Sequence, residues 1–335
     1  MKQLLLGAFL FLMPCLAALA QQRPQYTQYV QNNYLTNPAV GGIETYTDLR
    51  LGYRTQWTGL EGAPTSFYAT LHGSLGYNGN HSPKETKASH GGFSKQNSFK
   101  RSVPHHGFGM LAMMDKAGLL RTSTLNLSYS YHQPISRYLT LSSGISSGVS
   151  QFTFNSQNAV VYDPGDPYLS GTVQNALKAD LGLGVWLYSP DFFAGFSGGQ
   201  LLRNSSDVEN GGAAGQPHMR QQPHYYGTAG IRLQPSRDLS LVPSVMIKMT
   251  ESATPAIDFN LRALFSQRVW AGASYRHNDA MALMAGVNLS PLLDMSYSYD
   301  LTTSNLNQVS AGSHEVVIGF KLQNSQKVIC PTWVW

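Results

Sequence analysis

The pair His314-Glu315, near the end of the chain, has the residue types for acid–base chemistry. A histidine beside a carboxylate can take up and release protons near neutral pH. The pair begins a stretch in which apolar and polar residues alternate, and neighbours in a strand point to opposite faces. The two side chains would therefore not act easily on one substrate, and polar contacts at the mouth of a barrel are the favoured interpretation.

A serine hydrolase would need Ser, His and Asn or Asp side chains gathered in one place. The segment 195–199, Gly-Phe-Ser-Gly-Gly, is only superficially similar to a nucleophile motif. A strand whose small residues let neighbours approach closely explains it better. We predict no catalytic residue, no cofactor and no enzyme activity, with an outer-membrane hydrolase kept as a third hypothesis.

Several histidines invite a metal interpretation: His72, His81, His90 and the pair His105-His106. Zinc sites gather their ligands at definite spacing, with help from Cys or carboxylates. His81 and His90 lie in a polar, loop-like stretch, and the pair flanks the start of a predicted strand. Solvated histidines are the better explanation, and we predict no metal site.

The residues Asp163 to Pro167 alternate Asp, Pro and Gly. They lack the alternating ligands and the terminal Glu of an EF-hand calcium loop. Turn formation by Pro and Gly is the favoured explanation, and a weak extracellular calcium site is the alternative.

Residues 1–20 predict a secretory signal peptide. Lys2 supplies the positive start, Leu4 to Leu12 the apolar core, and Ala18-Leu19-Ala20 a small-x-small cleavage site. A membrane-spanning helix is disfavoured because the apolar run is short and Pro14 interrupts it. We expect a Sec-type route with cleavage near Ala20, which leaves one cysteine in the mature chain.

The composition favours a protein that meets lipid through strands. Charged residues make up only 12% of the chain, against ~25% in typical soluble domains. No stretch after Ala20 would span a bilayer as a helix. Low charge, 32 glycines and 18 tyrosines suit a barrel whose outer face is apolar. The net charge of +5 is modest and spread out, so nucleic-acid binding has little support.

A two-residue rhythm runs from Tyr46 to Leu322. In the stretch 257–265, for example, Ile257 and Phe259 fall on one face and Asp258 on the other, as expected for a strand with one apolar side. We therefore predict an all-β fold, a transmembrane antiparallel β-barrel of about 14 strands in an outer membrane. The predicted strands are 45–56, 65–75, 105–115, 119–133, 138–152, 178–188, 192–201, 224–234, 239–250, 255–265, 268–277, 280–289, 292–300 and 314–322.

Connector lengths favour this count. We assume that the chain starts in the periplasm and that successive strands cross the membrane in opposite directions. Five very short turns then fall on the periplasmic side, and the long connectors 153–177, 202–223 and 301–313 fall on the external side. Bacterial barrels show this asymmetry. The polar stretch 76–104 is the exception, interpreted as a flexible periplasmic insertion or as a missed pair of strands.

The chain divides into the signal peptide, a Gln/Asn/Tyr-rich lead segment (21–44), the barrel (45–322) and a periplasmic tail (323–335). About fourteen strands should leave an interior too wide for their own side chains to fill. The lead segment could enter it as a plug, because Tyr and Gln suit a half-wet interior, or could be a periplasmic docking arm. The lumen is expected to carry Arg50, Arg54, Asp180, Asp258, Arg262, Arg276, Asp294 and Glu315, and the lipid face Val316, Ile318, Phe320 and Leu322.

The loop between the first two strands contains Gln56-Trp57-Thr58-Gly59 and Gly62-Ala63-Pro64. Trp57 suits the boundary between lipid and water, where its ring is apolar and its N–H stays wet. Pro64 fixes the backbone and the glycines allow unusual dihedral angles. A structural turn that closes one mouth and a loop that contacts cargo are both open interpretations.

A set of blocks spread along the chain forms a more specific pattern. They are Gln28-Tyr29, Asn37-Pro38, Arg54-Thr55-Gln56-Trp57 with Gly59, Gly62-Ala63-Pro64, and Gly312-Ser313-His314-Glu315. This pattern resembles the PorP/SprF family, outer-membrane proteins of the type IX secretion and gliding-motility system of Bacteroidetes.

The resemblance implies a non-enzymatic barrel that works inside a secretion machine. It implies binding or anchoring of cargo, through the C-terminal domain of a secreted adhesin, or of machine subunits from the periplasmic ring or its accessory proteins. The residues of the blocks are then structural or partner-binding. A transport channel for small solutes is the alternative function.

Overall fold

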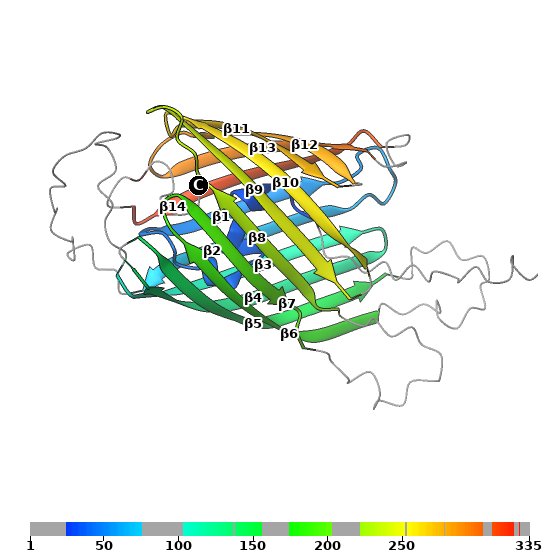
Figure 1. The fold of residues 1–335 in the computed structure, drawn as a ribbon. Coiled ribbons are helices and arrows are strands. Elements are labelled where there is room, and N and C mark those ends of the chain that lie inside the picture. The colour runs from blue at the N-terminus through cyan, green and yellow to red at the C-terminus, as the bar shows by residue number, and fades with distance from the viewer. Residues whose placement is uncertain are drawn as a thin grey trace, which may run out of the picture.

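The protein folds as one closed antiparallel β-barrel (Figure 1). The computed structural model describes residues 25–75, 103–136, 138–155, 174–202, 222–251, 253–277, 279–303, 310–324 and 328. Within these ranges fourteen strands pair in chain order, and the last strand closes the barrel against the first. The fold class expected from the sequence is confirmed.

The strands are β1 (Thr47–Thr55), β2 (Thr65–Leu75), β3 (His105–Ala117), β4 (Leu120–Pro134), β5 (Thr140–Phe154), β6 (Gln174–Tyr188), β7 (Phe192–Gly199), β8 (His224–Ile231), β9 (Leu239–Thr250), β10 (Ala253–Phe265), β11 (Val269–Arg276), β12 (Ala280–Asn288), β13 (Leu293–Thr302) and β14 (Ser313–Leu322). Each overlaps one predicted segment. The largest shift is at β6, which begins at Gln174 rather than at residue 178.

Alternation sorts the side chains into a lumen set and a lipid set. In β10, Asp258 and Arg262 are buried, whereas Phe259 and Leu261 between them are 54% and 50% exposed. Every charged residue expected in the lumen is buried. A closed barrel with an apolar outside satisfies all its backbone polar groups within the sheet, which is what a bilayer requires.

The two ends of the barrel differ in their connectors. At the long-connector end lie the turn 56–64, the long connections from β5 to β6, β7 to β8 and β13 to β14, and the short connections from β3 to β4, β9 to β10 and β11 to β12. At the short-connector end lie the turns 135–139, 189–191, 232–238, 266–268 and 289–292, together with the connection from β2 to β3. The assignment of the long-connector end to the outside stays a prediction.

The lead segment lies inside the barrel, where the blue ribbon of Figure 1 runs behind the wall strands. It forms three short 3₁₀ helices: η1 (Gln28–Val30), η2 (Asn33–Leu35) and η3 (Pro38–Val40). Its apolar side chains join those of the inner wall in one buried cluster, which includes Leu35 and Val40 from the segment and Leu111 and Trp186 from the wall. The lumen is therefore a packed core along much of the segment's path.

No helix among the residues with described structure is both long and apolar enough to cross a bilayer. Several parts of the chain lie outside the described residues. They are the signal peptide, most of 76–104, the central part of each of the three long connectors, the Asp163–Pro167 turn, and nearly all of the tail after Asn324. Expectations for these parts stay predictions.

Candidate functional site

The lead segment crosses the barrel from one end to the other. Its first described residue, Gln25, lines a cavity together with Gln56 and Trp57 of the long-connector end. Near its other end, the Gly41 carbonyl accepts a hydrogen bond from His132 Nε2 at 2.8 Å, close to the end of β4. Residue 25 and the start of β1 therefore lie at opposite mouths.

Arg54 holds a buried charged cluster at the long-connector end. Its guanidinium contacts Asp300 Oδ2 at 2.7 Å and Glu315 Oε2 at 3.2 Å. The same two carboxylates hold the lead segment, because Thr27 Oγ1 donates to Asp300 at 2.7 Å and Thr27 N donates to Glu315 at 2.8 Å. The Tyr68 hydroxyl completes the set by donating a hydrogen bond of 2.8 Å to Glu315 Oε1. We call these residues the Arg54 cluster.

A second charged group lies beside it. Asp258 Oδ2 accepts from Lys248 Nζ at 2.6 Å and from the Tyr29 hydroxyl at 3.1 Å, and Arg276 Nε lies 3.6 Å from Asp258 Oδ1. Burial raises the pKa of Tyr29 well above its ordinary range, and the Asp258 carboxylate raises it further. Tyr29 therefore stays a protonated donor, while its oxygen accepts from Asn260 Nδ2 at 2.9 Å.

The loop 56–64 folds across the start of β14. Gln56 N donates to Pro64 O at 2.9 Å, which closes the loop, and Thr58 N donates to Gly312 O at 2.8 Å. Trp57 N donates to Ser313 Oγ at 3.1 Å. Positive φ angles of 99° at Gly59, 71° at Gly62 and 87° at Gly312 fit residues without a Cβ. Ala63 N completes the loop by donating to Leu60 O at 3.3 Å. The loop 56–64 and the start of β14, more than 240 residues apart in the sequence, thus form one mouth of the barrel.

His314 and Glu315 point to opposite faces of β14. His314 Nδ1 lies 2.7 Å from the Tyr297 hydroxyl on the outer face, and Glu315 is fully buried in the lumen. The two side chains share no substrate-facing space, as expected from strand geometry.

Asn37 and Pro38 seat the lead segment against the wall of β5, β6 and β7. Asn37 Nδ2 donates to the carbonyl oxygens of Val185 at 3.0 Å and Phe196 at 3.3 Å, while its Oδ1 accepts from Ala39 N at 2.9 Å. Pro38 begins η3 with the fixed φ that suits the first helical position. A Cβ built at Gly144 would lie 2.5 Å from Ala39 N, so only glycine admits this approach.

The histidines at the short-connector end hydrogen-bond to the backbone of the lead segment. His105 Nε2 lies 3.0 Å from Gly42 O, and the His105 and His132 rings stack with centroids 4.4 Å apart. His72 and His105 are buried, so the expectation that they are solvated is wrong: the lead segment covers them. Across the described ranges, no group of three His, Cys, Asp or Glu residues is arranged to hold a metal.

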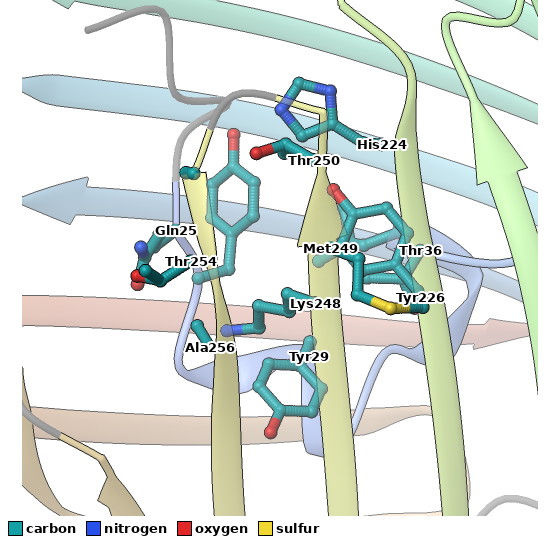
Figure 2. A pocket seen from close by; sticks show the side chains of 13 residues that line it. Gln25, Tyr29, Thr36, His224, Tyr226, Lys248, Met249, Thr250, Thr254 and Ala256 are labelled. Atoms are coloured by element: carbon teal, nitrogen blue, oxygen red, sulfur yellow. The ribbon is translucent and has the colours of Figure 1, made fainter. Parts of the chain in front are cut away.

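Two cavities adjoin at the long-connector end, and Gln25 lines both. The first, which we call the apolar pocket, has about 80 Å³ and lies between the lead segment and β8, β9 and β10. Figure 2 shows Tyr29 and Lys248 at its floor, with Tyr226 and Met249 on one wall. The second, which we call the acidic hollow, has about 300 Å³ and lies over the Arg54 cluster.

Of the fifteen residues singled out from the sequence, all but His314 belong to the Arg54 cluster, the Asp258 group, the loop 56–64 with the start of β14, or the Asn37–Pro38 seat. Gln28 is fully buried and its backbone N lies 3.3 Å from Glu315 Oε2, which places it in the Arg54 cluster. Sequence reasoning missed Thr27, Asp115 and Asp300 as members of the mouth. Asp115 and Asp300 lie on the polar face of their strands near a strand end, and this position is the sequence signal that could have predicted them.

The comparisons with known proteins agree with this architecture. The family model described as type IX secretion system membrane protein PorP/SprF matches residues 18–320. A search of curated proteins finds no match. The toluene transporter TbuX of Ralstonia pickettii superposes with a TM-score of 0.52 at 9% identity, over 88% of this chain and 94% of that one. This likeness shows the fold alone.

Two further outer-membrane barrels are more distant. The protein Omp33 of Acinetobacter baumannii has a TM-score of 0.46 at 8% identity, over 84% of this chain and 100% of that one. A FadL homologue of Pseudomonas aeruginosa has a TM-score of 0.46 at 10% identity, over 90% of this chain and 94% of that one. The family match covers most of the chain and is the stronger finding. Fold and family together indicate the outer membrane, and the chain belongs to the PorP/SprF family of type IX secretion system membrane proteins.

Proposed function

We propose that the protein is a non-enzymatic, partner-binding component of the type IX secretion machine, whose long-connector mouth receives cargo. The observation that carries the proposal is the assembly of the sequence blocks at that mouth. The loop 56–64, the start of β14 and Thr27 are bonded together around two cavities. Rigid elements that present open cavities suit recognition of a partner.

We propose that the short-connector end binds other subunits of the secretion machine. In this scheme the C-terminal domain of a secreted adhesin binds the long-connector mouth, while subunits of the periplasmic ring or its accessory proteins bind the turns of the other end and the tail. The lead segment acts as a plug that keeps the lumen closed between the two. Its many buried contacts with the inner wall support this role.

Photo-cross-linking in whole cells tests the division of roles. A cross-linker at Gln56 or Glu61 is expected to capture exported cargo, and one at Ser136 is expected to capture machine subunits. Leu283, 62% exposed on the outer face of β12, is the matched control and should capture neither. The same partners at both ends would contradict the proposal.

A transport channel for small solutes is the alternative function. The cavities at the long-connector mouth favour it, whereas the packed lead segment opposes it. Single-channel conductance of the purified barrel separates the two: a closed lumen predicts little current, and steady ion conduction would favour the channel.

A further inference from the structure

The acidic hollow has an excess of negative charge in its wall and floor. Among the described residues it is lined by Asp115, Asp279 and Asp300, and by two cations, Arg54 and Arg276. Below it lie Glu315 and Asp258, with Lys248 as the third cation. Five carboxylates thus face three cations. Lys116, next to Asp115, is exposed on the other face of β3 and adds nothing to this balance.

Two of these carboxylates are only partly compensated by the protein. Asp300 is only 2% exposed, and while its Oδ2 binds Arg54 and Thr27, its Oδ1 has no hydrogen-bond partner in the described chain. Asp115 accepts a bond of 2.5 Å from Ser66 Oγ, and no cation of the described ranges pairs with it. Asp115 is a half-buried carboxylate that lines the hollow without a cation of its own, so the hollow favours a positive ligand beside it.

The rest of the hollow favours a long side chain over a bare ion. Its volume of about 300 Å³ equals roughly ten water molecules. Trp57, Pro64 and Ala117 line it, and aromatic and apolar residues suit the charged head and the alkyl stem of a basic side chain. The guanidiniums of Arg54 and Arg276 in the same wall repel a divalent cation about twice as strongly as a singly charged side chain.

We propose that the acidic hollow binds a lysine or arginine side chain of the protein segment that docks at the long-connector mouth. The identity of that segment rests on the proposed function, and the chemistry of the hollow does not. Asp115 receives the cation, Asp279 and Asp300 add negative charge to the wall, and Trp57 lines the same hollow.

Peptide binding to the full-length barrel in detergent tests this. The probe is a fluorescent hexapeptide, capped at both ends, of glycine and serine around two lysines. The reference peptide has two glutamates in their place. We expect the lysine peptide to bind at least ten times more tightly at low salt, and to weaken as salt rises because exposed charges are screened.

Variants place the binding in the hollow. Asp115→Asn should weaken binding of the lysine peptide about five- to tenfold, a change of the size expected for loss of one charged contact. Asp279→Asn removes a second carboxylate of the wall, which also pairs with Arg276 at 2.9 Å, and should weaken binding in the same direction. The matched control is Asp191→Asn, which removes an exposed carboxylate at the short-connector end and should leave binding unchanged. Thermal unfolding shows whether each variant is folded. If one of the two variants does not fold, the other still tests the inference.

Three results would overturn the inference: equal binding of both peptides, an equal loss in Asp191→Asn, or calcium ions that bind with Asp115-dependent affinity while the lysine peptide does not compete. The cross-linking experiment stands apart. Selective peptide binding without cargo cross-links sinks the proposed function alone, and cargo cross-links without selective peptide binding sink this inference alone.

Discussion

The two ends of the lumen hold the same segment by different physical means. At the short-connector end the backbone of Ala39 to Gly42 packs directly on wall glycines and accepts bonds from Ser142, His132 and His105. The cavities that line this part of the segment have only about 10 and 30 Å³. At the long-connector end Thr27 is held by charged groups beneath a hollow of about 300 Å³. Close backbone packing fixes position, whereas ion pairs beside an open cavity leave room for a partner.

The largest effect should follow from breaking the charged end. Arg54→Met leaves Asp300 and Glu315 buried without their cation, which is expected to cost ~3–5 kcal/mol. The urea-unfolding midpoint of the purified barrel measures it. Arg237→Met, in an exposed turn of the short-connector end, is the control and should change stability by less than ~0.5 kcal/mol.

A double variant sharpens this result. Because Glu315→Gln removes one of the charges that Arg54 compensates, the pair Arg54→Met/Glu315→Gln should be less destabilised than the sum of its single variants. Strict additivity, or an Arg54→Met barrel as stable as the parent, would show that the cluster does not hold the mouth.

The seat of the lead segment on the wall glycines should respond to side-chain size. Gly144→Leu places side-chain atoms where the Ala39 backbone lies, and overpacking of this kind costs ~1–3 kcal/mol. Gly227→Ala is the control, since a Cβ there meets nothing within 4 Å. Thermal unfolding should separate the two variants, and equal stability would contradict the close seat of the segment.

Asn37→Ala removes three hydrogen bonds of the same seat at once. Its amide caps η3 and bridges two wall carbonyls, so a loss of ~1–2 kcal/mol is expected. Hydrogen exchange should rise at residues 39–42 and stay unchanged at Thr27, because the charged end is held separately. A uniform rise along the whole segment would argue against two independent anchors.

The smallest effect concerns the outer rim. Ser313→Ala removes the acceptor of the Trp57 backbone N–H, which is expected to cost ~1 kcal/mol. Proteolysis of the loop 56–64 should quicken while the barrel stays folded. An unchanged cleavage rate would show that the other rim bonds suffice without this one.

The strands were predictable because alternation is a local signal. The face of each β10 residue follows from the two-residue period, and short turns such as Ser189 to Asp191 give the strand count. The path of the lead segment was not predictable. Its 3₁₀ turns carry no period, and its place depends on wall residues such as Gly144 and Val185, more than 100 residues away in the sequence.

The candidate site was predictable in part for the same reason. Alternation places Arg54 and Glu315 in the lumen, and barrel closure makes them direct neighbours in the register of β1 and β14. It does not say that Thr27 reaches them or that the lead segment covers His72. Those contacts depend on how an irregular segment fills a space that only the closed barrel creates.

The central claim is that the lead segment threads the barrel, with residue 25 at one mouth and the start of β1 at the other. Single cysteines at Gln25 or Ser136, each in a Cys330→Ser background, can be labelled in intact cells with a bulky maleimide that does not cross the outer membrane. The account predicts that Gln25→Cys reacts in intact cells and that exposed Ser136→Cys reacts only after permeabilisation. Reaction of both from the same side would contradict it.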